Sequence, residues 1–87
     1  MNYRITTSQY FNVAAKRLAK KYHSFKQDLQ VFRDELLKNP QQGVELSPGI
    51  RKIRLAIKSK GKGKSGGARV ITYSFIAKEN EGEIVLL

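Results

Sequence analysis

The residues best suited to chemistry are eight basic side chains within residues 51–69, a stretch without any acidic residue. They are Arg51, Lys52, Arg54, Lys58, Lys60, Lys62, Lys64 and Arg69. Arginine holds phosphate oxygens in a planar fork, and lysine offers a compact charge whose pKa responds to its surroundings. We therefore interpret this stretch as a site for a phosphodiester, with nucleic acid as the expected partner.

Three of these cations, Lys52, Arg54 and Arg69, fall on predicted strands, which hold side chains rigidly. Residues 52–58 alternate, so Lys52 and Arg54 share the polar face. Residues 68–77 predict the next strand, but both of its faces are largely apolar, and the pattern does not settle which face Arg69 takes. Such a triangle can bind RNA. It can also cleave RNA if the lysine removes the 2′-hydroxyl proton and the arginines neutralise the transition state. Pattern alone does not choose between binding and cleavage.

Other motifs are weaker. Residues 61–66 match G-x-G-x-x-G, but a strand follows where dinucleotide binding needs a helix. His23 falls in a turn and is interpreted as a turn residue rather than a catalytic base. Tyr73 shares the parity of Arg69 and could stack on an RNA base. The chain has no cysteine and one histidine, and its scattered acidic residues have no metal-ligand spacing, so we predict no metal and no cofactor.

Length and charge limit the remaining classes of protein. The 87 residues fit one domain, residues 1–87. The formal net charge is +10, which favours a polyanionic partner and a cytoplasmic setting. No apolar run approaches the ~18–20 residues that span a bilayer, so no membrane association is expected.

The hydrophobic pattern predicts an α+β fold of order β-α-α-β-β-β, an antiparallel sheet with a helical hairpin packed on one face. The predicted elements are a strand at 3–6, helices at 9–22 and 25–38, a connection at 40–49, and strands at 52–58, 68–77 and 84–87. The sequence stops inside the last strand, so we expect a C-terminal segment to be missing. The exposed edge expected for that strand also predicts self-association.

Three stretches resemble the RelE/ParE toxin superfamily, most closely the RelE/HigB-like branch of bacterial type II toxin–antitoxin systems. They are residues 36–40, 49–56 and 60–73, and KGKGKSGGARVITY is the most specific. The resemblance implies a RelE-like fold and a ribosome-dependent endoribonuclease (mRNA interferase) that cleaves mRNA in the A site without a metal. It also implies a cognate antitoxin.

The same resemblance implies roles for individual residues. Lys52 matches the general base, Arg54 a phosphate-stabilising cation and Arg69 the arginine that stabilises the transition state. The loop lysines match positions that contact ribosomal or messenger RNA; they are Lys58, Lys60, Lys62 and Lys64. The family continues into a segment that supplies the leaving-group acid, so cleavage by these 87 residues alone stays an open question.

Two other functions remain open at the level of sequence. One is a non-catalytic ParE-like toxin that inhibits DNA gyrase. The other is a simple RNA-binding module, because residues 67–73 loosely resemble an RNP1 strand, although the order of elements does not suit that fold. The cations Lys52, Arg54 and Arg69 favour the ribonuclease.

Overall fold

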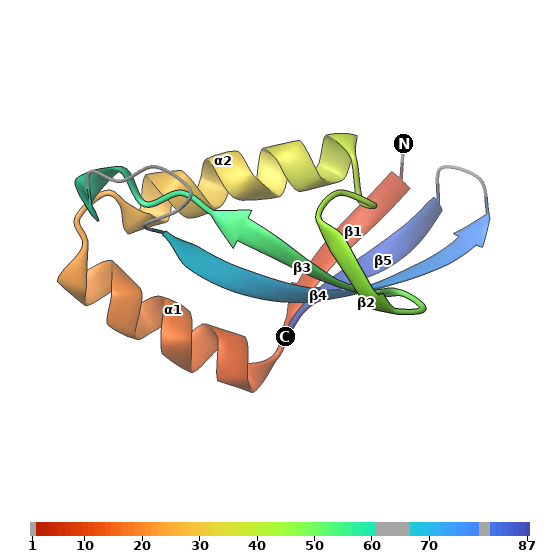
Figure 1. The fold of residues 1–87 in the computed structure, drawn as a ribbon, viewed down its shortest axis with the longest axis horizontal. Coiled ribbons are helices and arrows are strands. Elements are labelled where there is room, and N and C mark those ends of the chain that lie inside the picture. The colour runs from red at the N-terminus through yellow and green to blue at the C-terminus, as the bar shows by residue number, and fades with distance from the viewer. Residues whose placement is uncertain (1, 61–66, 79–80) are drawn as a thin grey trace.

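The computed structural model describes residues 2–60, 67–78 and 81–87 of the chain. The elements are β1 (Asn2–Thr7), α1 (Gln9–Lys21), α2 (Phe25–Lys38), β2 (Val44–Ser47), β3 (Ile50–Leu55), the 3₁₀ turn η1 (Lys58–Lys60), β4 (Ala68–Lys78) and β5 (Glu81–Leu86). Within these residues, two helices and one five-stranded sheet form an α+β domain, which confirms the predicted class (Figure 1).

Both helices lie where the apolar periodicity predicts them. Ser8 Oγ accepts the backbone N–H of Phe11 at 3.1 Å and caps the first turn of α1. Ser24, which precedes α2, makes no side-chain cap hydrogen bond, and its hydroxyl donates to Asp28 Oδ2. Among the described residues, neither helix is long and apolar enough to cross a membrane.

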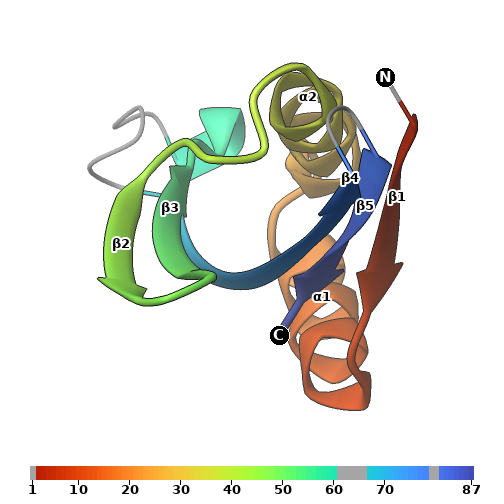
Figure 2. The same ribbon diagram turned by 90° about the vertical axis from the view of Figure 1, so that its right-hand side faces the viewer.

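The strands follow the order β1-β5-β4-β3-β2 across the sheet. The neighbours β2–β3, β3–β4 and β4–β5 are antiparallel, whereas β1 pairs with β5 in parallel. The sheet is therefore mixed, and the first and last strands of the chain lie side by side. Figure 2 shows a strongly curved sheet with α2 along its inner side.

The sheet differs from the predicted one in three respects. The predicted connection contains the short edge strand β2, all four residues of which are exposed, so no burial pattern reveals it. The sheet is mixed rather than antiparallel, because β1 pairs with a strand about 80 residues away, which no local signal predicts. The prediction that the C-terminal strand is an edge is also wrong, because β5 is paired on both sides by β1 and β4. Self-association stays a prediction, without that edge as its basis.

The hydrophobic core lies between the helices and one face of the sheet. Its buried members are Phe25, Phe32 and Leu36 of α2 together with Ile53, Leu55, Ile57, Val70, Ile84 and Leu86. Helix α1 adds the partly buried Phe11, Ala15 and Leu18. The helical hairpin therefore covers one face, as predicted, and the sheet's other face stays open.

Candidate functional site

The open face of the sheet brings together the three cations predicted to do chemistry. Cross-strand partners share a face, and Arg54 of β3 is the direct partner of Arg69 of β4. Lys52 is the partner of Ile71, which lies two residues along β4 from Arg69. Directly opposed Cβ atoms are about 4.5–5.5 Å apart and diagonal ones roughly 7–8 Å apart. Lys52, Arg54 and Arg69 therefore form one cluster, the cationic triad, opposite the buried Ile53.

The cationic triad makes no ion pair within the part of the chain that the structure describes. Among the described residues, the ion pairs are Arg4–Glu83 and Arg51–Glu45, and neither uses Lys52, Arg54 or Arg69. Arg54 and Arg69 are exposed, whereas Lys52 is partly buried. Like charges placed directly opposite each other destabilise a sheet. The arrangement therefore has an energetic cost that a bound anion would remove.

Apolar residues flank Lys52 in the sheet. Lys52 lies between Val44 of β2 and Ile71 of β4, its partners on either side. An anion attracted by Arg54 and Arg69 would approach Lys52 from the open face.

Gly67 sets how closely β4 approaches β3 beside the triad. A Cβ added at this position would collide with the carbonyl oxygen of Leu55 and lie 3.1 Å from the Cα of Ala56. Only glycine permits this approach, two residues before Arg69. The missing side chain thus helps to set the separation between Arg69 and its partner Arg54.

The buried carboxylate of Asp28 connects η1, which follows β3, to α2. Asp28 Oδ2 accepts the backbone N–H of Lys58 at 3.0 Å and the hydroxyl of Ser24 at 2.7 Å. Ser24 Oγ in turn accepts the backbone N–H of Ser59 at 2.9 Å. Both N–H groups belong to η1, which follows β3. The hydrogen bond to Asp28 of α2 therefore fixes the backbone of Lys58, whose side chain is exposed.

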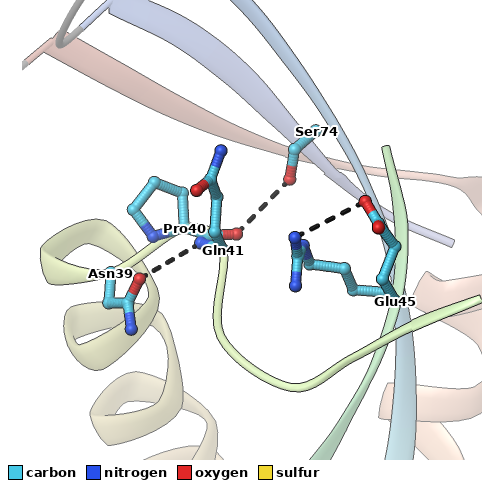
Figure 3. A network of polar contacts seen from close by, with 6 residues as sticks. Asn39, Pro40, Gln41, Glu45 and Ser74 are labelled. Atoms are coloured by element: carbon cyan, nitrogen blue, oxygen red, sulfur yellow. Dashed lines mark hydrogen bonds and ion pairs between the residues drawn. The ribbon is translucent and has the colours of Figure 1, made fainter. Parts of the chain in front are cut away.

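Arg51, predicted to contact RNA, does not share the face of the triad. It pairs across the sheet with Thr72, which is fully buried, so it points to the helix-covered side. Its side chain is only 17% exposed and lies 3.5 Å from Glu45. Figure 3 draws Glu45 together with the hydrogen bond that the Ser74 hydroxyl donates to the carbonyl oxygen of Pro40, which follows α2. The period of two along β3 separates Arg51 from its neighbour in the triad.

The other predicted residues are only partly accounted for. Tyr73 lies on the open face, since its partners are Ile50 and Val85. Lys62 and Lys64 lie outside the described residues, as does the side chain of Lys60.

The residues predicted not to do chemistry also have described positions. His23 is exposed in the turn between the helices, as predicted. Within the described part of the chain, no group of three or more His, Cys, Asp or Glu residues could hold a metal ion.

Two residues of the open face were missed from the sequence. Phe75 follows Tyr73 by two residues on β4 and is 58% exposed. Its alternation with Arg69 was a usable signal. Arg4 reaches this face from β1, because it pairs with Glu83, the partner of Phe75. No local pattern could have shown this, since it depends on the parallel pairing of β1 with β5.

The cationic triad can bind the oxygens of a phosphodiester and neutralise charge that develops on them. No known family model matches the chain.

Proposed function

We propose that the chain is a RelE/HigB-like toxin, a ribosome-dependent endoribonuclease whose open sheet face binds and cleaves mRNA. Two lines of reasoning support this. The resemblance of residues 36–40, 49–56 and 60–73 assigns roles to Lys52, Arg54 and Arg69, and these residues form the cationic triad. The single observation that carries the proposal is the direct opposition of two arginines, neither of which takes part in an ion pair among the described residues.

The chemistry proceeds without a metal. Lys52 takes the proton from the 2′-hydroxyl, whose oxygen then attacks the adjacent phosphorus and forms a bond to it. The bond from phosphorus to the 5′-oxygen of the next nucleotide breaks, and that oxygen takes up a proton from water. This leaves a 2′,3′-cyclic phosphate and a 5′-hydroxyl end. Arg54 and Arg69 stabilise the charge that accumulates on the phosphate oxygens in the transition state.

The proposed partners follow from the same charge. The ribosome positions the messenger, and the lysines of residues 58–64 contact RNA phosphates, with Lys58 held in place by α2. A cognate antitoxin neutralises the toxin by bringing acidic residues to the cationic face, because opposite potentials guide such association.

A cleavage experiment with matched charge changes tests the proposal. The wild-type chain is added to ribosomes that are translating a defined mRNA, and the new 5′ ends are mapped. The test variant is Arg54→Gln/Arg69→Gln, and the control is Lys16→Gln/Lys26→Gln, which removes two exposed cations from the helices.

We expect the wild type and the control to cut the messenger in the A site and the test variant to lose the cuts. Equal cleavage by test and control variants would contradict the assignment of the triad. A wild-type chain that binds ribosomes without any cleavage would contradict cleavage by these 87 residues, and inhibition of DNA gyrase by it would favour the ParE-like alternative.

A further inference from the structure

We propose that Tyr73 and Phe75 form a platform on which bases of single-stranded RNA stack, so that the open face binds an unstacked strand in preference to a duplex. The inference rests on the proposed function, because it extends the same face. It assigns to the two aromatic side chains a role that is separate from phosphate binding by the cationic triad.

Two exposed aromatic side chains, Tyr73 and Phe75, follow Arg69 along β4. Strand β4 places Arg69, Ile71, Tyr73 and Phe75 in one line on the open face. Tyr73 is 41% exposed and Phe75 is 58% exposed, whereas large aromatic side chains normally lose most of their exposed surface on folding. Along the strand, Tyr73 lies roughly 13–14 Å from Arg69, and Phe75 roughly 7 Å farther. The rings therefore lie within a few nucleotides of the phosphate site.

The ring of Tyr73 lies against the turn between β2 and β3. Gly49, in the turn between β2 and β3, has φ of +81°, and a Cβ added there would lie 3.3 Å from Cε1 of Tyr73. Its carbonyl oxygen accepts the backbone N–H of Ser74 at 2.8 Å. The ring of Tyr73 thus packs against the backbone of this turn while part of it stays exposed. A ring fixed in this way loses little conformational entropy when a base stacks on it.

The two ends of the open face differ in charge. Phosphate-binding cations lie at one end, around Arg54 and Arg69. At the other end, the partner of Phe75 is Glu83, whose carboxylate lies 3.5 Å from the guanidinium of Arg4. Among the side chains that the structure describes, that end offers rings and a neutralised carboxylate rather than unpaired cations, so it suits bases better than phosphates. Bases of a duplex keep their faces covered, and only a single strand can present them to the rings.

An RNA-binding experiment separates stacking from phosphate attraction. The probes are an unstructured RNA of about ten nucleotides, the matching duplex, and inorganic polyphosphate, which has charge but no bases. The wild type is compared with Tyr73→Leu, Phe75→Leu and Arg54→Gln/Arg69→Gln, and Phe75→Tyr serves as the control that keeps a ring. Affinities are measured over a series of salt concentrations.

We expect each Leu variant to bind single-stranded RNA roughly 5- to 150-fold more weakly, the loss of stacking on one ring. Its salt dependence and its affinity for polyphosphate should not change, and Phe75→Tyr should bind like the wild type. The arginine variant should instead lower the salt slope by about 0.7 per lost phosphate contact, for RNA and polyphosphate alike. Because the chain contains no tryptophan, Phe75→Trp adds a single reporter whose fluorescence RNA should quench and polyphosphate should not.

Other results would overturn the platform, and they differ in what they leave standing. Leu variants that bind RNA normally beside a weakened arginine variant would reject the platform and keep the cationic site. If neither set of variants weakens RNA binding, the open face is not an RNA surface and the proposed function fails as well. Leu variants that change the oligomeric state in sedimentation, with RNA affinity unchanged, would make the rings a contact between copies of the chain.

Discussion

Arg54 and Arg69 are direct partners on adjacent strands of the open face, and neither takes part in an ion pair among the described residues. A sheet evolving for stability alone would favour an opposite charge at one of these positions. An anionic ligand bound between the two arginines, close to Lys52 on the diagonal, would relieve this repulsion.

The first prediction is that function and stability conflict at this pair. Arg54→Glu creates a cross-strand ion pair with Arg69, and we expect the free energy of unfolding to rise by about 0.2–1 kcal/mol at low salt. RNA affinity should fall at the same time. Urea unfolding measures the stability, with Arg54→Gln as the control for loss of charge alone. A less stable Arg54→Glu protein would contradict the repulsion that we infer.

The second prediction concerns a buried hydroxyl on the covered face. Thr72 is fully buried, and its Oγ1 has no hydrogen-bond partner. Thr72→Val keeps the β-branched shape and removes the unsatisfied group, so we expect a gain of about 1 kcal/mol in thermal or urea unfolding. Thr72→Ser keeps the hydroxyl and loses the methyl group, and it should be less stable than the wild type. A destabilised Thr72→Val protein would show that the hydroxyl has a partner in solution.

The third prediction is that Asp28 holds η1 in place. Asp28→Ala leaves the backbone N–H of Lys58 without its acceptor and the Ser24 hydroxyl with only Ser59 Oγ to donate to, and we expect a loss of about 1–3 kcal/mol in the free energy of unfolding. Hydrogen exchange at the amides of Lys58 and Ser59 should accelerate more than exchange in β4.

A double-mutant cycle with Ser24→Ala should give a coupling energy of about 0.5–3 kcal/mol, because both side chains belong to one hydrogen-bonded network. Additive effects of the two substitutions would mean that the network does not act as a unit.

Much of the fold was predictable because its local signals agree with one another. Ser8 caps α1 where the apolar stripe begins, and α2 ends at Lys38, before Asn39 and Pro40. Two features of the sheet were not predicted, one because the paired strands are distant in sequence and the other because the strand is fully exposed. Strand β2 has no buried residue to reveal it, and the parallel pairing of β1 with β5 depends on strands at opposite ends of the chain.

The site was predictable where one face of a strand is buried. Ile53 and Leu55 on the covered face fix Lys52 and Arg54 on the other. Arg69 was ambiguous because β4 is a central strand, with Val70 and Thr72 buried under the helices and Tyr73 and Phe75 exposed on the opposite side. Only the pairing of β4 with β3 resolves which face it takes.

The most direct measurement of the central claim compares ribosome binding with mRNA cleavage for Lys52→Ala. Because this substitution removes the proposed proton acceptor and leaves Arg54 and Arg69, cleavage should fall at least 100-fold, the usual contribution of a general base, while ribosome binding changes by less than about threefold. Lys16→Ala, which removes an exposed cation from α1, should retain both activities. Normal cleavage by Lys52→Ala would contradict the account, and so would parallel loss of cleavage and binding.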